Sequence, residues 1–206
     1  MLTRPLSIFG AWEITPVQHR DARGVFLEWY RADRLSSAID DTFVLAQANI
    51  SVSAAGVVRG IHYTDVPPGQ AKYVTCVQGR VLDVVVDLRV GSPTFGRCEV
   101  VPLDDVERRA VYISEGLGHG FCALTENATI TYLCSSAYDP AHEREVHPLD
   151  PRLEIPWPLA SPQLSARDAR AISLTDALSA GLLPVAAKCR NGLPTETGRI
   201  RRTDDA

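Results

Sequence analysis

The sequence predicts a mainly β protein built as a sandwich or jelly roll, and two observations support this. Short runs rich in Val, Ile, Tyr and Thr recur between residues 6 and 135. Gly, Pro and Asp separate them, which is typical of many short strands joined by turns. Helical patterns are few and short, and they cover Arg31–Ile39 and parts of the stretch after Leu164. The predicted strands are Val25–Tyr30, Phe43–Ser51, Val57–Tyr63, Lys72–Val77, Val81–Leu88, Arg97–Pro102, Ala110–Ile113 and Thr129–Cys134.

The length and composition fit one domain with a substantial core. The chain has 206 residues, of which 45% are hydrophobic, and no repeat or linker divides it. We expect residues 1–190 to form this domain. The end of the chain, Asn191–Ala206, is polar and contains Gly, Pro and a cluster of charges, so we expect it to fray.

The charge pattern argues against two classes of partner. The formal net charge is −4 with both signs interspersed, whereas nucleic acids and anionic membranes favour a basic surface. No apolar stretch is long enough to span a membrane, and Met1–Pro5 lacks the apolar run of a signal peptide. We therefore expect a cytoplasmic protein. The 5 cysteines include no CxxC pair, which favours buried reduced thiols over disulfides or a zinc site.

One turn predicts where two charged residues lie. Gln78-Gly79 separates two strong strands, and a two-residue hairpin at this point would place Lys72 and Asp83 diagonally on one face. Charges among Val and Leu are costly unless they are paired or functional. The pattern leaves two interpretations open, a salt bridge on a solvated face and a pair of functional groups.

Motifs at fixed spacing run along most of the chain. The central part consists of Val58–Tyr63, Gly69–Lys72, Gln78-Gly79, Asp83–Arg89 and Gly91–Gly96. The flanking part consists of Arg23-Gly24, Phe26, Gln47, Asn49, Ser51, Gly118–Phe121, Tyr132, Tyr138, Asp150-Pro151, Trp157-Pro158 and Leu164–Asp168. Together these residues resemble the dTDP-4-dehydrorhamnose 3,5-epimerase family, and the resemblance covers about residues 5–185.

The resemblance implies a cupin-like jelly-roll barrel that works as a homodimer without metal or cofactor. It implies an isomerase that epimerises dTDP-4-keto-6-deoxyglucose at carbon 3, carbon 5 or both. In that scheme His62 is the general base, Asp168 orients it, Tyr132 is the general acid and Lys72 stabilises the enolate. The implied binding residues are Gln47, Asn49, Arg59, Asp83, His119 and Tyr138 around the nucleotide sugar, with Arg23 and Phe26 on an arm that reaches the partner subunit's site.

These residue types suit proton transfer beside a ketone. Removing such a proton puts charge on the carbonyl oxygen, so an epimerase needs a base, a group that holds the oxyanion and a donor on the opposite face. Histidine fits the first task because its unperturbed pKa lies near neutrality. A positioned base or acid contributes about 10²- to 10⁴-fold in rate, and an aimed cation or donor about 10²- to 10³-fold.

The sequence leaves open the facing of the Arg59 and His62 side chains and the contact made by Asp168. Arg59 and His62 would lie on opposite faces of a regular strand, and they share one face only if the strand has a bulge at Gly60. Ser165 and Asp168 have the spacing of a helix capping box, so Asp168 either caps a helix or orients His62, and the two roles are compatible.

The motifs also leave several alternatives to a 3,5-epimerase open. Pro67–Gly69 and Leu133–Ser136 look more like the branch that supplies antibiotic deoxysugars, in which some members epimerise one carbon. Other readings are a 3,4-ketoisomerase of the same nucleotide sugar and a non-catalytic sugar-nucleotide-binding cupin. The long signature and the combination of base, acid and enolate-stabilising group favour an epimerase. We predict no metal, because Thr64 breaks the His-x-His pair that many cupins use.

Overall fold

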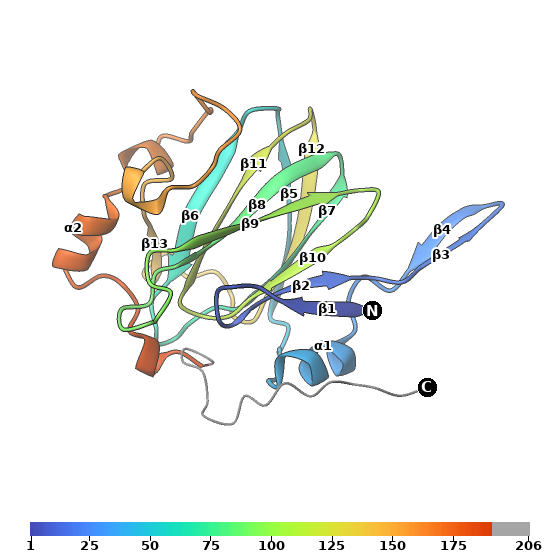
Figure 1. Ribbon diagram of the computed structural model, residues 1–206, viewed down its shortest axis with the longest axis horizontal. Helices are drawn as coiled ribbons and strands as arrows, with labels where there is room; N and C mark the ends of the chain where they lie inside the picture. Colours follow the sequence, from blue (N-terminus) through green and yellow to red (C-terminus); the bar gives the residue numbers. More distant parts are fainter. Residues whose placement is uncertain (191–206) are drawn as a thin grey trace.

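The structure, a computed structural model, describes residues 1–190 and consists of two antiparallel sheets packed face to face (Figure 1). The six-stranded sheet contains, in order, β1 (Leu2–Pro5), β2 (Ala11–Thr15), β10 (Ala110–Ile113), β7 (Lys72–Gln78), β12 (Ala128–Cys134) and β5 (Gln47–Ser53). The five-stranded sheet contains β13 (Glu143–Glu145), β6 (Val58–Thr64), β11 (Leu117–Ala123), β8 (Arg80–Asp87) and β9 (Cys98–Asp104). The prediction of a mainly β jelly roll is confirmed. The expected fraying of Asn191–Ala206 lies outside the described residues.

The core between the sheets follows from the alternation of side chains along each strand. Val74 and Ile130 from the six-stranded sheet pack with Val85 and Phe121 from the five-stranded sheet in one buried cluster. Successive residues of a strand point to opposite faces, so every second residue of these strands lies between the sheets. The same alternation decides which polar residues face inward.

Short helices cover the outer faces of both sheets. Helix α1 (Ala32–Ile39) matches the predicted helix and packs Leu35 against Tyr73 on the outside of the six-stranded sheet. The outside of the five-stranded sheet is covered by the C-terminal elements, where Leu174 packs near Ile61. These elements are η1 (Pro151–Leu153), η2 (Asp168–Arg170), α2 (Leu174–Ser179) and η3 (Ala186–Lys188). No helix within residues 1–190 has the length and apolar character needed to cross a membrane.

The predicted hairpin at Gln78-Gly79 is wrong. Strand β7 pairs with β10 and β12, whereas β8 pairs with β11 and β9, so the chain passes from one sheet to the other at this turn. Gly79 has a φ of 75°, and its N–H donates to Asp105 rather than across a hairpin. Lys72 and Asp83 consequently lie on different sheets, and their predicted diagonal neighbourhood is also wrong.

Strand β11 was not predicted, and glycine explains why. Gly118 and Gly120 resemble turn signals in the sequence, but both lie in the middle of this strand. A side chain at Gly120 would come within 2.8 Å of the carbonyl oxygen of Arg59 and 2.7 Å of a methyl group of Ile61. These glycines therefore serve the close approach of β6, not a turn. Strands β1, β2, β3 and β13 were also not predicted, and the remaining strands match within a few residues.

Strand β6 has a bulge at Gly60, the condition under which Arg59 and His62 can share one face, and this bulge decides which residues of β6 face inward. His62 is opposite His119 and Arg59 is opposite Phe121, so β6 has one more residue than β11 between these pairs. Gly60 has a φ of 128°, and an added Cβ would lie 2.6 Å from the Cα of Gly120. The bulge thus places Arg59 and His62 on the same, inward face.

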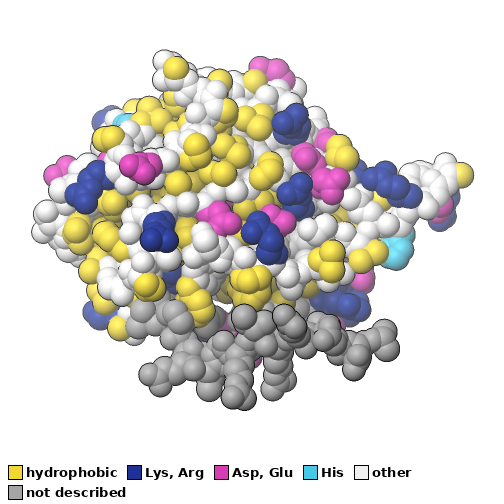
Figure 2. Space-filling model, in the orientation of Figure 1, with side chains coloured by type: hydrophobic (Ala, Val, Ile, Leu, Met, Phe, Trp, Pro, Cys, Tyr) yellow, Lys and Arg dark blue, Asp and Glu magenta, His cyan; other side chains and the backbone are white. Residues whose placement is uncertain are grey.

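A two-stranded hairpin extends away from the body. It consists of β3 (Gln18–Asp21) and β4 (Gly24–Leu27), and Figure 1 shows it projecting beyond both sheets. Phe26 near its tip is 68% exposed. Figure 2 shows acidic and basic side chains interspersed over the visible face, without a large area of one sign.

We predict that Gly60→Ala destabilises the protein more than Gly24→Ala does. Both glycines have a φ near 130°, so the backbone strain of the two substitutions is matched, but nothing lies within 4 Å of an added Cβ at Gly24. Overpacking at Gly60 should therefore cost about 1–3 kcal/mol more in the free energy of unfolding. Urea unfolding of both variants at one protein concentration tests this, and equal losses would contradict the proposed steric role.

Candidate active site

The candidate site lies between the sheets, at one end of their shared inner face. His62 and His119 are directly opposite each other on β6 and β11 of the five-stranded sheet. Lys72 is opposite Cys134, and Tyr132 is opposite Asn49, in the six-stranded sheet. Tyr132 packs against the core cluster between the sheets. His119 is two residues from both Leu117 and Phe121 of that cluster, so its side chain points to the same inner face. The two sheets therefore present these residues to each other from facing walls.

His62 and Asp168 form a hydrogen-bonded pair. The distance from His62 Nε2 to Asp168 Oδ1 is 2.6 Å, although the two residues are 106 positions apart in the sequence. Asp168 belongs to η2 and is 2% exposed, whereas the His62 side chain is 34% exposed. Since Nε2 faces the carboxylate, Nδ1 is the ring nitrogen that can take a proton from a bound molecule.

The capping contact at this turn is made by Ser165, and the Asp168 carboxylate bonds the Ser165 hydroxyl and no backbone N–H of the turn. The backbone N–H of Asp168 donates to Ser165 Oγ at 3.0 Å, and Ser165 Oγ donates to Asp168 Oδ2 at 2.9 Å. Burial raises the pKa of Asp168, but the hydrogen bond and charge of His62, the hydroxyl of Ser165 and the charge of Arg167 outweigh burial, so the pKa lies below its ordinary value. One carboxylate thus contacts both the helical turn and the histidine.

Asp83 pairs with His119 and not with Lys72. The distance from Asp83 Oδ2 to His119 Nε2 is 2.7 Å. Asp83 is fully buried, and its other oxygen, Oδ1, has no hydrogen-bond partner among the described residues. A buried carboxylate needs a partner of this kind. The structure therefore excludes the salt bridge that the predicted hairpin would have allowed.

The polar ends of Lys72 and Tyr132 have no bonding partner among the described residues. Within residues 1–190, the ammonium of Lys72 forms no ion pair and the hydroxyl of Tyr132 forms no hydrogen bond. Burial, together with nearby Cys134 and Glu143, raises the pKa of Tyr132, so its hydroxyl keeps its proton at neutral pH. A cation and a protonated phenol are thus available on the same wall.

The remaining predicted binding residues of the body lie around this wall. Arg59 donates from Nε to Ser53 Oγ at 3.1 Å and from Nη2 to the carbonyl oxygen of Val52 at 3.4 Å. Gln47 accepts a hydrogen bond from the backbone N–H of Tyr138 at 2.7 Å. Sequence reasoning missed Ser53, which fixes the guanidinium, although its alternation with the inward residues of the same strand was a usable signal.

Arg23 and Phe26 are not brought to this site within one chain. Both lie on the β3–β4 hairpin, where the Arg23 side chain is 90% exposed and pairs with Asp21 at 2.6 Å. Their predicted place in the site therefore requires a second chain.

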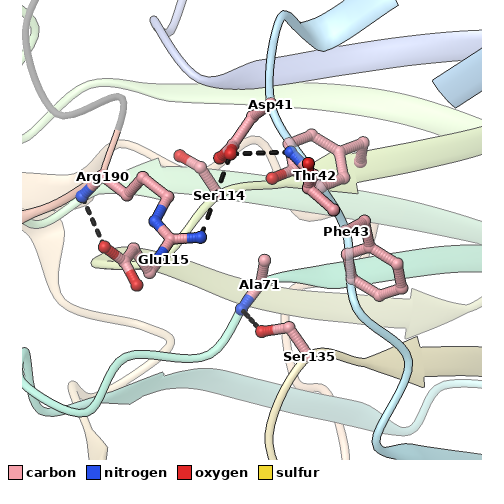
Figure 3. Close-up of a pocket in the computed structure, with 9 residues that line it drawn as sticks. Asp41, Thr42, Phe43, Ala71, Ser114, Glu115, Ser135 and Arg190 are labelled. Carbon is pink, nitrogen blue, oxygen red and sulfur yellow. Dashed lines mark hydrogen bonds and ion pairs between the residues drawn. The ribbon is translucent and has the colours of Figure 1, made fainter. Parts of the chain in front are cut away.

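A small pocket lies behind the site, on the outer side of the six-stranded sheet. Figure 3 shows Asp41, Thr42, Phe43, Ser114, Glu115 and Arg190 around it, and Arg190 pairs with Asp41 at 3.9 Å. Its floor includes Ala71 and Ser135, which neighbour Lys72 and Cys134 in the sequence, and Ala71 N–H donates to Ser135 Oγ. None of the predicted catalytic side chains lines this pocket.

Across the described part of the chain, no three His, Cys, Asp or Glu side chains gather closely enough to hold a metal ion. Both histidines on the inner wall already bond a carboxylate through Nε2.

The jelly roll and its inner-face residues define a protein suited to acid–base chemistry on a small molecule. The family described as dTDP-4-dehydrorhamnose 3,5-epimerase matches residues 5–176, and the chain belongs to this family. It is therefore an epimerase, which is a class of isomerase, and its fold is that of the cupin-like members.

Individual relatives agree over nearly the whole length. A dTDP-4-dehydrorhamnose 3-epimerase of Streptomyces niveus is 64% identical over 92% of this chain and 92% of its own. The crystal structure of NovW, described as a 4-keto-6-deoxy sugar epimerase of the novobiocin cluster of Streptomyces spheroides, has a TM-score of 0.91 at 64% identity and covers 92% of this chain and 96% of its own. That of ChmJ, a 3'-monoepimerase of Streptomyces bikiniensis in complex with dTDP-quinovose, has a TM-score of 0.87 at 54% identity and covers 89% and 93%.

We predict that Asp168→Asn lowers stability in a pH-dependent way. A carboxylate whose folded pKa lies below its ordinary value of 3.8 stabilises the fold above that value and loses this effect as pH falls through the lowered pKa. Urea unfolding should show the wild type more stable than the variant by about 1.5–3 kcal/mol at about pH 5, with the difference shrinking towards about pH 3.5. A difference that grows on acidification would contradict this account.

Proposed function

We propose that the substrate is dTDP-4-keto-6-deoxyglucose and that carbon 3 is inverted, in the biosynthesis of a deoxysugar. The family name includes carbon 3, and so do the names of the Streptomyces niveus and Streptomyces bikiniensis relatives described above. Carbon 5 is the second candidate, because the family name includes it as well. The bound dTDP-sugar in the ChmJ structure supports a dTDP-linked substrate.

One observation carries the proposal: the candidate base and the candidate acid stand on facing sheets. His62 projects from the five-stranded sheet and Tyr132 from the six-stranded sheet, both towards the space between them. A sugar ring held in that space has one group on each face. Inversion at carbon requires this arrangement, because a single base returns the proton to the side from which it came.

The steps follow from the protonation states of the groups. His62 Nδ1 takes the proton from the carbon beside the ketone, and the electron pair of that C–H bond moves to the carbonyl oxygen. The ammonium of Lys72 stabilises the resulting enolate. Tyr132, whose pKa is raised by burial, then gives its hydroxyl proton to the opposite face of the carbon. Proton exchange with solvent restores the histidine and the phenol.

Asp168 orients His62 in this scheme. Its hydrogen bond to Nε2 holds the imidazole in the tautomer whose Nδ1 can accept a proton, and its negative charge stabilises the imidazolium that forms. Arg59 supplies positive charge and N–H donors for the diphosphate, and His119 offers its second ring nitrogen, Nδ1, because Nε2 bonds Asp83. Gln47, Asn49 and Tyr138 contact the nucleotide sugar nearby, and Asp83 holds His119 in place.

We also propose a homodimer in which the β3–β4 hairpin enters the partner subunit's site. The hairpin projects from the body (Figure 1), and Phe26 and Arg23 near its tip are exposed. An exposed strand pair of this kind is an unprotected edge in a monomer.

We expect His62→Asn to abolish uptake of solvent deuterium while dTDP binding stays nearly intact. Asparagine has a similar size but cannot take a proton near neutral pH, so the rate should fall about 10²- to 10⁴-fold. NMR of the nucleotide sugar in deuterium oxide reports each exchanged carbon, and a dTDP titration on the same sample reports binding. A stable variant that exchanges deuterium at the wild-type rate would rule out His62 as the base.

Tyr132→Phe should behave differently from His62→Asn. The phenylalanine removes the opposite-face donor but leaves the base, so deuterium should still enter with retention of configuration while epimerised product is lost. Loss of exchange and inversion in parallel would show that Tyr132 is not the separate acid.

Mixing two impaired variants tests the dimer. If Phe26 completes the partner's site, Phe26→Ser and His62→Asn should each be impaired alone, whereas subunit exchange gives mixed dimers with one intact site each. Random mixing should then restore about one quarter of wild-type activity. The control is Leu178→Ser, which changes an exposed apolar residue of α2 away from the hairpin. This variant should be active without mixing. A monomer by light scattering with full activity would contradict the proposal.

A further inference from the structure

A Ser-x-x-Asp motif occurs twice in the C-terminal segment. The first copy is Ser165 with Asp168, where η2 begins, and the second is Ser173 with Asp176, where α2 begins. In both copies the backbone N–H of the aspartate donates to the serine Oγ at 3.0 Å. The serine hydroxyl donates in return to Oδ2 of the same aspartate, at 2.9 Å in the first copy and 2.7 Å in the second.

The two copies differ in what the other carboxylate oxygen meets. Oδ1 of Asp168 lies 2.6 Å from Nε2 of His62, and Asp168 is 2% exposed. Asp176 is exposed, and its Oδ1 bonds no residue within 1–190. The second copy therefore serves the end of a helix alone, whereas the first also holds a carboxylate that faces the candidate base.

The direction of both bonds in the first copy follows from the groups that form them. A backbone N–H can only donate, so Ser165 Oγ accepts the bond from the N–H of Asp168. An ionised carboxylate can only accept, so the hydroxyl proton of Ser165 must point at Oδ2. Asp168 is ionised at neutral pH, since its pKa lies below its ordinary value of 3.8. The hydroxyl of Ser165 thus has one orientation.

The carboxylate needs such a contact because its rotation is otherwise soft. The terminal torsion of an aspartate side chain is broad, unlike the staggered torsions between saturated carbons. The helical turn fixes the backbone of Asp168 but leaves this rotation free. Among residues 1–190 the side chain of Asp168 forms hydrogen bonds with His62 and Ser165 alone. The Ser165 hydroxyl is therefore the one hydrogen-bonding group of the described chain, besides the histidine itself, that sets the plane of the carboxylate.

We propose that Ser165 is a positioning residue for the reaction, which sets the rotation of the Asp168 carboxylate so that Oδ1 faces His62. Ser165 reaches the histidine through Asp168, so its effect is on the orientation of the base. The proposal rests on the proposed function for the role of His62 as the base. Its effect on the bond between His62 and Asp168, however, can be measured in the ligand-free protein.

The first test compares Ser165→Ala with Ser173→Ala. Each substitution removes the same hydroxyl and the same capping bond, so the two losses of stability should be similar. Ser165→Ala should lower the rate of deuterium uptake by the nucleotide sugar about threefold to tenfold, which corresponds to the loss of one hydrogen bond. Ser173→Ala should exchange deuterium at the wild-type rate. Equal losses of rate in both variants would contradict the proposal.

Two further variants separate the hydroxyl from the cap. Ser165→Thr keeps a hydroxyl and should restore most of the rate. Ser165→Gly removes the hydroxyl, but glycine is well tolerated at the start of a helix, so its stability should lie closer to that of the wild type. Its rate should nevertheless fall as in Ser165→Ala. A rate that follows stability across these variants, rather than the presence of the hydroxyl, would overturn the proposal.

Steady-state kinetics distinguish positioning from ligand binding. In Ser165→Ala, kcat and kcat/KM should fall together, because a misoriented base weakens the transition state and not the bound substrate. KM for the nucleotide sugar and the dissociation constant of dTDP should each change by less than about twofold. A raised KM with an unchanged kcat would place Ser165 in ligand binding and overturn its positioning role.

A spectroscopic measurement tests the same bond without substrate. In ligand-free protein with ¹⁵N-labelled histidine, the ring N–H of His62 gives an NMR signal that is identified by its absence from His62→Asn. Ser165→Ala should shift this signal, whereas Ser173→Ala should leave it in place. The ring N–H of His119, which bonds a different carboxylate at 2.7 Å, is the internal reference and should stay unchanged in both variants.

The failure of this proposal differs from the failure of the proposed function. An unmoved His62 signal in Ser165→Ala, or a wild-type rate of deuterium uptake in that variant, overturns the positioning role of Ser165 and leaves His62 as the base. A stable His62→Asn variant that exchanges deuterium normally overturns the proposed function, and with it the catalytic half of this proposal.

Discussion

The close approach of β6 to β11 at Gly60 and Gly120 is the constraint on which the site depends. The two backbones come so near that neither position has room for a side chain. The extra residue in β6 at this point reverses the alternation between Arg59 and His62, so a candidate phosphate ligand and the candidate base share one wall. Without the bulge, one of these two side chains would lie in the outer cluster that the C-terminal elements cover. Two glycines on neighbouring strands thus decide the chemistry of a surface to which they contribute no functional atom.

Polar groups on the inner face differ in how they are satisfied, and the difference matches their proposed roles. The buried carboxylates of Asp83 and Asp168 each bond a histidine at 2.6–2.7 Å. Lys72 and Tyr132, by contrast, have no partner among residues 1–190, so their polar ends are available to a ligand. A site that must hold an anionic nucleotide sugar and move protons beside its ketone benefits from both conditions. The two carboxylates are hydrogen-bonded to fixed partners, whereas the cation and the phenol remain open to substrate.

The sequence alone predicted the fold class, eight of the strands within a few residues, helix α1 and the residues of the family signature. The sequence left open whether Arg59 and His62 share one face and named a bulge at Gly60 as the condition for it, and the structure has that bulge. The pairing of β7 and β8 could not be predicted, because a short turn with glycine is compatible both with a hairpin and with a crossing between sheets. The partner of Asp83 was misassigned for the same reason. Strand β11 was missed because glycines needed for backbone approach look like turn signals.

The candidate base, His62, and the carboxylate hydrogen-bonded to it, Asp168, lie 106 positions apart in the sequence. During synthesis, β6 and every other strand of the two sheets are made before η2. The pair forms only when the segment after Leu164 folds back over the outer face and inserts one acidic side chain at the end of the sheet. The His62–Asp168 pair is therefore completed by one of the last segments of the described chain to be made. The same segment covers the outer face of the five-stranded sheet, so a cut there would remove the carboxylate partner of His62 together with the apolar packing of Leu174 near Ile61.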